Sequence, residues 1–163
     1  MNILVVDDDY NKINNISSDL LMKDPSNKIK IATDYEQAVS FIMDNKDYID
    51  LIVLDWCFPP NSWSRGRYAM GRQVINTMKL SNTFISTIIC SSDVINIDKN
   101  EYPFVLGSIT YCDGLDVSDY IYSHINKPEE KEDDYIGQPK VLKKIKEDTK
   151  YKRKKSSTPW WIK

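Results

Sequence analysis

The sequence predicts an α/β fold in which helices cover both faces of a doubly wound, five-stranded parallel sheet. Short apolar runs that end on polar or turn-forming residues indicate strands buried on both faces of a sheet. Between these runs lie stretches whose apolar residues recur at helical spacing. The two patterns alternate along residues 1–127. Such alternation is typical of parallel sheets, because parallel strands must be joined by a crossover.

The first elements are clearly patterned. Residues 1–6 form an apolar run that predicts the first strand, and residues 11–22 carry isoleucine and leucine at helical spacing. Residues 28–32 predict a short second strand. Asp34 is suited to cap the helix that follows, because Gln37 stands three residues later as in a capping box.

The third strand is predicted at residues 51–54, where four consecutive apolar residues end on Asp55. Asp55 therefore stands at the carboxyl end of a strand, where open α/β sheets place their ligands. An irregular stretch with two prolines and two arginines follows at residues 57–68, and helical spacing returns from Met70 to Met78.

The rest of the domain shows two further strands and one further helix clearly, and a second helix only weakly. Residues 84–90 predict the fourth strand, residues 104–111 the fifth and residues 116–126 the last helix. A further helix is due at residues 94–103, but this segment is rich in β-branched residues, asparagine and proline. We therefore expect at most a turn or two there.

The charge of the chain is unevenly distributed. The formal net charge is −2, yet residues 1–138 carry 12 Lys/Arg against 22 Asp/Glu, and residues 139–163 carry 10 against 2. We therefore expect a domain at residues 1–127, followed by a charged linker and a basic C-terminal tail at residues 128–163.

The composition also indicates a compartment. The sequence has no apolar run long enough to span a bilayer and no signal-peptide pattern. Its three cysteines, Cys57, Cys90 and Cys112, are too few and wrongly spaced for a disulfide framework. We expect a cytoplasmic protein in which these cysteines are small buried side chains, with a thiol or metal cluster as the weaker alternative.

Polar residues follow three of the predicted strands: Asp7 and Asp8 the first, Asp55 the third and Ser91 the fourth. Carboxylates gathered at one sheet edge repel one another unless a cation lies between them, and their oxygens suit Mg²⁺. A carboxylate beside that ion can accept a phosphoryl group, which Ser91 would then hydrogen-bond. The alternative is that the acids are solvated strand-end carboxylates and that Ser91 caps the next turn.

Two motifs carry a resemblance to a known family. Ile3-Leu4-Val5-Val6-Asp7-Asp8 resembles the first-strand motif of response-regulator receiver domains. Leu51-Ile52-Val53-Leu54-Asp55-Trp56-Cys57-Phe58-Pro59 resembles the phosphoacceptor motif of the same family. The resemblance covers about residues 1–127 and implies the flavodoxin-like receiver fold.

The resemblance also implies a chemistry. Asp55 would accept a phosphoryl group from a histidine kinase or a phosphotransfer protein. Asp7, Asp8 and Asp55, together with the backbone carbonyl of Cys57, would hold Mg²⁺. Ser91 matches the position of the family's switch serine or threonine.

The sequence departs from the family at the end of the fifth strand, where receivers carry a lysine that pairs with the phosphate. Tyr111 stands in place of this lysine, and no lysine occurs between Lys99 and Lys127. Tyrosine donates one hydrogen bond but brings no charge. We therefore expect a site whose metal and acceptor groups are present and whose phosphate-binding cation is missing.

These observations favour a stand-alone signalling protein, not an enzyme, that takes a phosphoryl group on Asp55 and acts by contact with a protein partner. The alternative is a pseudo-receiver, a binding module that acts as an adaptor or inhibitor without phosphorylation. A third hypothesis is a nucleic-acid-associated regulator that works through residues 139–163. A solubilising tail that folds back onto the acidic body explains the same charge pattern.

Overall fold

The computed structural model describes residues 1–112 and 114–125, so the linker and basic tail predicted at residues 128–163 lie outside the described residues. Five parallel strands form one sheet in the order β2-β1-β3-β4-β5. The strands are β1 (Asn2–Val6), β2 (Lys28–Ala32), β3 (Leu51–Leu54), β4 (Thr87–Ser91) and β5 (Val105–Thr110). The helices are α1 (Tyr10–Lys23), α2 (Tyr35–Asn45), α3 (Met70–Leu80) and α4 (Val117–Ile125). The predicted fold class is confirmed.

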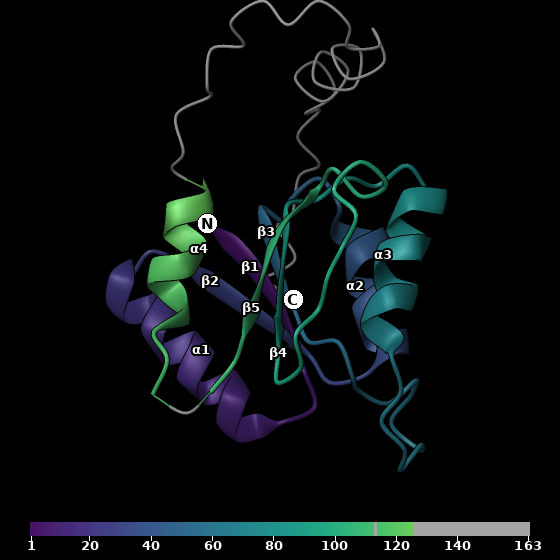
Figure 1. Ribbon diagram of the computed structural model, residues 1–163, viewed down its shortest axis with the longest axis horizontal. Coiled ribbons are helices and arrows are strands. Elements are labelled where there is room, and N and C mark those ends of the chain that lie inside the picture. Colours follow the sequence, from purple (N-terminus) through teal and green to yellow (C-terminus); the bar gives the residue numbers. More distant parts are fainter. Residues whose placement is uncertain (113, 126–163) are drawn as a thin grey trace, which may run out of the picture.

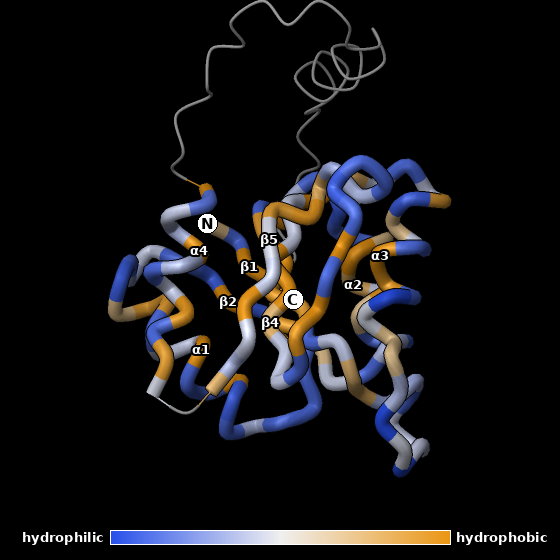
Figure 2. Tube along the Cα trace, in the orientation of Figure 1, coloured by the Kyte–Doolittle hydropathy of each residue, from blue (hydrophilic) through white to orange (hydrophobic). Residues whose placement is uncertain are grey.

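The helices cover both faces of the sheet, with α1 and α4 on one face and α2 and α3 on the other (Figure 1). Each face has its own apolar cluster. In β1, Ile3 and Val5 pack toward α1, whereas Leu4 and Val6 pack toward α2 and α3. Successive side chains of a strand point to opposite faces, so a doubly covered strand must be apolar throughout. Figure 2 shows the hydrophobic stretches of the sheet, in orange, between the two pairs of helices.

Side-chain caps set the starts of the first two helices. α1 begins one residue earlier than predicted, because the carboxylate of Asp9 accepts hydrogen bonds from the backbone N–H groups of Asn11 and Lys12. α2 follows Asp34, whose carboxylate accepts from the backbone N–H of Gln37 at 2.9 Å. The predicted capping box is therefore present. Among the described residues, no helix is long and apolar enough to cross a bilayer.

The second half of the chain differs more from the prediction. β4 begins at Thr87 and not at residue 84, because its pairing with β3 starts where Thr87 lies opposite Ile52. The apolar run extends beyond this ladder: the ring of Phe84 packs instead against that of Phe104, with centroids 5.7 Å apart. Residues 92–104 contain turns and bends but no helix, as their composition predicted.

The topology brings the ends of β1 and β3 together. β1 pairs with β2 on one side and with β3 on the other, so the strand order reverses beside β1. Open α/β sheets bind ligands at such a switch point. Val6 lies opposite Leu54, and the N–H of Asp55 donates to the carbonyl of Val6 at 2.8 Å. Asp7 and Asp55 therefore emerge side by side at this edge.

Candidate functional site

Three carboxylates meet at the carboxyl ends of β1 and β3. One oxygen each from Asp7, Asp8 and Asp55 lies within 4.8 Å of the other two. Asp7 and Asp55 are buried, and Asp8 is half-buried. A set of carboxylate oxygens this close together suits a hard divalent cation such as Mg²⁺. We call Asp7, Asp8 and Asp55 the acidic cluster.

Both carboxylate oxygens of Asp55 have partners. Oδ1 accepts a hydrogen bond from Lys12 Nζ at 2.7 Å. Oδ2 accepts one from the backbone N–H of Cys57 at 3.0 Å and another from Arg67 Nη2 at 3.3 Å. The Asp55 side chain is only 2% exposed. Two cations therefore balance its buried charge, and neither of them was among the predicted site residues.

Lys12 reaches the acidic cluster from the first turn of α1. Its Nζ lies 2.7 Å from Asp55 Oδ1, 2.8 Å from Asp7 Oδ2 and 2.6 Å from the carbonyl oxygen of Cys90. An ammonium group has three donors, so these three acceptors satisfy it. The expectation that the site lacks a cation is wrong: β5 carries no lysine, but Lys12 of α1 lies against Asp55.

A signal for Lys12 existed in the sequence. The residue stands four positions before Ile16, on the stripe of α1 that also buries Ile13 and Leu20. A lysine in such a stripe must direct its charged end to a buried partner, because an unpaired ammonium is costly inside a protein. The available partners were the carboxylates that follow the first and third strands, Asp7 and Asp55.

The electrostatics follow from this burial. Burial raises the pKa of Asp7 to about 6, the charge of Asp55 adds to the rise, and Lys12 opposes it. Burial by itself would lower the pKa of Lys12, but the carboxylates of Asp7 and Asp55 outweigh it and raise that pKa above its usual value. Lys12 therefore remains charged.

Arg67 reaches the acidic cluster from the segment between β3 and α3. Its Nε donates to the carbonyl of Cys57 at 3.0 Å, and its Nη2 lies 3.1 Å from Asp8 Oδ1. The contact with Asp8 has the distance of an ion pair but not the geometry of a hydrogen bond. Asp8 Oδ1 is buried, and it accepts no hydrogen bond from the described residues. The Arg67 side chain is 53% exposed.

Backbone pairing fixes the place of Arg67. Phe58 and Tyr68 form an antiparallel bridge in which each N–H donates to the other residue's carbonyl at 3.1 Å. We call residues 59–67, which this bridge closes, the bridged loop. The carbonyls of Pro59 and Pro60 accept from the first N–H groups of α2. Because Arg67 directly precedes Tyr68, the bridge sets where its side chain begins.

α3 approaches the end of β3 closely at Gly71. A Cβ atom at this position would lie 2.6 Å from the carbonyl oxygen of Asp55 and 2.9 Å from the Cα of Trp56. The N–H of Gly71 donates to the carbonyl of Trp56 at 3.1 Å. Only glycine allows this approach, which positions the backbone on either side of the Asp55 side chain.

Ser91 and Tyr111 lie near the acidic cluster but make other contacts. The Ser91 hydroxyl is buried at the end of β4 and accepts from the backbone N–H of Asp93 at 3.4 Å, a turn-capping contact. The Tyr111 hydroxyl accepts from Asn15 at 3.0 Å, and its ring centroid lies 5.3 Å from Lys12 Nζ. Their roles toward a phosphoryl group stay predictions.

The cysteines form no metal cluster within the described residues. None of the three is in a disulfide. Cys90 is buried, and burial raises the pKa of its thiol to about 12. Cys57 is half-buried and Cys112 is exposed, so the expectation of small buried side chains holds fully only for Cys90.

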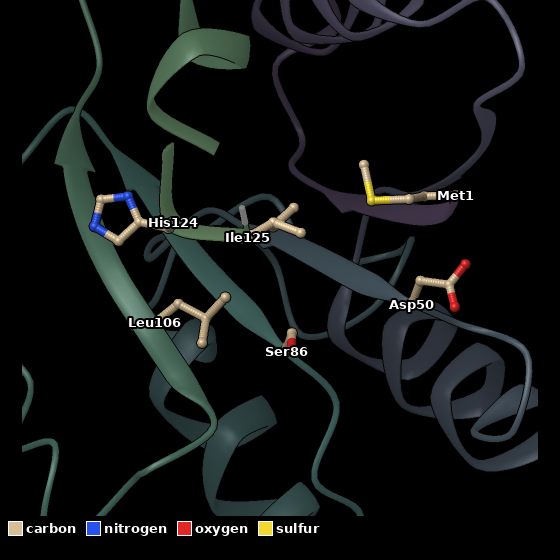
Figure 3. A pocket seen from close by; sticks show the side chains of 6 residues that line it. All are labelled: Met1, Asp50, Ser86, Leu106, His124 and Ile125. Atoms are coloured by element: carbon tan, nitrogen blue, oxygen red, sulfur yellow. The ribbon is translucent and has the colours of Figure 1, made fainter. Parts of the chain in front are cut away.

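A hollow lies at the opposite edge of the sheet (Figure 3). It is lined by Met1, Asp50, Ser86, Leu106, His124 and Ile125. Met1, Asp50 and Ser86 directly precede β1, β3 and β4, so this hollow lies at the amino ends of the strands. Ligands of parallel α/β sheets bind at the carboxyl ends, which makes the acidic cluster the stronger candidate.

Comparison with known proteins identifies the fold. A receiver domain from Clostridium thermocellum superposes with a TM-score of 0.56 at 21% identity, over 77% of this chain and 94% of that one. The phosphorylated cyanobacterial phytochrome response regulator RcpA gives 0.56 at 23% identity, over 76% of this chain and 89% of that one. TrrA from Thermotoga maritima, in complex with Mg²⁺ and BeF, gives 0.57 at 17% identity, over 76% and 97%. No protein-family profile and no curated protein sequence matches this chain.

Proposed function

We propose that this chain, which has the fold of response-regulator receiver domains, is a signalling module that accepts a phosphoryl group on Asp55. The observation that supports the proposal best is the 2.7 Å contact between Lys12 Nζ and Asp55 Oδ1. A phosphoacceptor carboxylate needs a nearby cation, because its phosphorylated form carries more negative charge than the carboxylate itself. Lys12 supplies that cation from α1.

In this proposal Asp55 is the nucleophile. Lys12 holds Oδ1, and the backbone N–H of Cys57 donates to Oδ2, which lies on the side of the half-exposed Arg67. A carboxylate oxygen forms a bond to phosphorus while the bond between phosphorus and the leaving group breaks. The leaving group departs with the electron pair, and an aspartyl phosphate remains.

The neighbouring groups would stabilise the added charge. Asp7, Asp8, Asp55 and the carbonyl of Cys57 would hold Mg²⁺, which would balance charge on the phosphoryl oxygens when bound. Lys12 balances charge from the opposite side. We assign to Ser91 a hydrogen bond to a phosphoryl oxygen. Tyr111 stands where receivers carry lysine, and we infer that its ring positions Lys12, which lies 5.3 Å from the ring centroid.

The partners follow from the same chemistry. A histidine kinase or a phosphotransfer protein would donate the phosphoryl group, and the output would be contact with a second protein. Two structural neighbours bear on this chemistry: RcpA was solved phosphorylated, and TrrA with Mg²⁺ and BeF. The module would be a switch and not an enzyme that turns over a substrate.

The test is direct. The protein is incubated with acetyl phosphate and Mg²⁺, and its intact mass is followed over time. The expected result is the mass of one added phosphoryl group, which Asp55→Asn abolishes. No adduct, under conditions that label an ordinary receiver domain, would refute the proposal.

A second candidate is a binding module that works without phosphorylation. It is supported by the closure of the site: both oxygens of Asp55 have partners, and the side chain is 2% exposed. This candidate requires that partner binding be the same for the wild type, with or without acetyl phosphate, and for Asp55→Asn. The nucleic-acid hypothesis rests on residues 139–163, outside the described residues. It predicts steeply salt-dependent binding that is lost on truncation after Gln138.

A further inference from the structure

The guanidinium of Arg67 contacts one side of the acidic cluster. It touches three groups: the carbonyl of Cys57 through Nε at 3.0 Å, and Asp8 Oδ1 and Asp55 Oδ2 through Nη2 at 3.1 and 3.3 Å. Two carboxylates and one backbone carbonyl make a ligand set that a divalent cation of the Mg²⁺ type takes. Arg67 thus binds ligands that such an ion would need.

We propose that the guanidinium of Arg67 occupies the position that a divalent cation would take beside Asp8, Asp55 and the carbonyl of Cys57. The side chain and a metal ion would therefore compete for this position. The inference deepens the proposed function, because it adds a condition for loading the same site. The side chain must move away before Asp8, Asp55 and the Cys57 carbonyl can all face an ion.

Lys12 and Arg67 pair with different carboxylates of the acidic cluster, although both contact Asp55. Lys12 lies between Asp7 and Asp55, and its three donors are all satisfied. Asp8 has its ion pair with Arg67 instead. A mobile ion would therefore replace Arg67 and leave Lys12 where it is.

The contacts of Arg67 permit this exchange. Its ion pair with Asp8 lacks hydrogen-bond geometry, so a buried oxygen of Asp8 keeps an unused acceptor that a metal ion would coordinate. The Arg67 side chain is 53% exposed and can rotate into solvent. The Phe58–Tyr68 bridge holds the backbone meanwhile, so displacement requires no unfolding of the bridged loop.

Competition is tested by measuring metal binding directly. The full-length wild type and Arg67→Gln are titrated with Mn²⁺, and the free ion is followed by electron paramagnetic resonance. Glutamine keeps a side-chain donor but removes the charge. Arg65→Gln is the matched control, because Arg65 lies in the same loop, is exposed like Arg67, and forms no ion pair within the part of the chain described.

We expect Arg67→Gln to bind Mn²⁺ about tenfold more tightly than the wild type, since one unit of competing charge leaves the site. Arg65→Gln should stay within about twofold, because salt screens a more distant charge. Equal affinity of Arg67→Gln and the wild type would overturn the proposal. An equal gain in both variants would overturn it as well, because the effect would then be one of net charge.

A measurement on the unaltered protein guards against a variant that misfolds. The Nε–H resonance of Arg67 in ¹⁵N NMR should shift on saturation with Mg²⁺, while that of Arg65 should not. A bound ion with an unmoved Arg67 resonance would refute the competition. Neither measurement uses a phosphodonor. A protein that shows the competition but never takes up a phosphoryl group would refute the proposed function and leave this inference standing.

Discussion

Lys12 Nζ and Asp55 Oδ1 lie 2.7 Å apart, although 43 positions separate the two residues in the sequence. The contact joins the first turn of α1 to the end of β3 and places a positive charge between two buried carboxylates. The stability of the fold and the proposed chemistry of Asp55 therefore depend on the same ammonium group.

Lys12→Met should destabilise the protein. Removal of one partner from a buried ion pair leaves an uncompensated charge and costs about 3–5 kcal/mol. Urea unfolding followed by circular dichroism measures the loss. Adding Asp7→Asn should restore part of it, because one buried charge is then removed.

The matched control for this variant is Lys23→Met in the same helix. Lys23 pairs with Asp119 at the surface, where both side chains are well exposed, so its loss should destabilise the protein far less than the loss of Lys12. Equal losses for the two lysine variants would show that the buried pair has no special role.

Lys12→Gln should also slow the formation of the Asp55 adduct. Removing one preorganised cation from a site of developing negative charge lowers the rate on the order of 100-fold. Intact mass against time, with acetyl phosphate and Mg²⁺, gives the rate, and Lys23→Gln should react like the wild type. An unchanged rate in folded Lys12→Gln would remove Lys12 from the proposed mechanism.

Gly71→Ala should destabilise the protein by about 1–3 kcal/mol, the usual cost of overpacking. The added methyl group would meet the carbonyl oxygen of Asp55 and the backbone of Trp56, at 2.6 and 2.9 Å. Thermal or urea unfolding measures the change. Gln73→Ala, on the exposed side of α3, should alter stability by less than about 0.5 kcal/mol. Similar values for both would contradict the close approach of α3 to β3.

The three cysteine thiols should react at different rates at pH 8. Burial raises the pKa of Cys90 to about 12, so this group remains a protonated thiol at pH 8 and does not react as a nucleophile. Cys112 is exposed and should react first with Ellman's reagent. Cys57 should react more slowly, because burial and the charge of Asp55 raise its pKa.

Absorbance against time at pH 8 follows this reaction. Cys112→Ser should lose the fast phase, and Cys90 should react only after unfolding in urea. A fast phase that persists in folded Cys112→Ser would contradict the assignment.

The strands and helices could be predicted because their pattern is local. The four apolar residues of β3, the stripe of α1 and the Asp34–Gln37 cap all express short-range rules. The acidic cluster followed from one further rule, that parallel strands end at the same edge. The start of β4 could not be predicted, because it depends on where β3 offers a partner and not on where the apolar run begins.

Lys12 and Arg67 are the residues that local reasoning missed. The side chain of Lys12 spans from α1 to the ends of β1 and β3, and its partner Asp55 is settled only when those elements pack. Arg67 depends on the bridge between Phe58 and Tyr68, which joins two positions of a segment without periodicity. The absence of a lysine from β5 was read correctly, but a cation can reach the same carboxylate from another element.

The bridge between Phe58 and Tyr68 also makes the chain useful for protein engineering. It closes the bridged loop by backbone pairing. The segment between Asn61 and Arg65 therefore determines neither the register of the sheet nor the backbone position of Arg67. Lengthening a closed loop costs little free energy. A fluorescent reporter or a peptide epitope grafted there should leave the sheet and the Phe58–Tyr68 bridge in place.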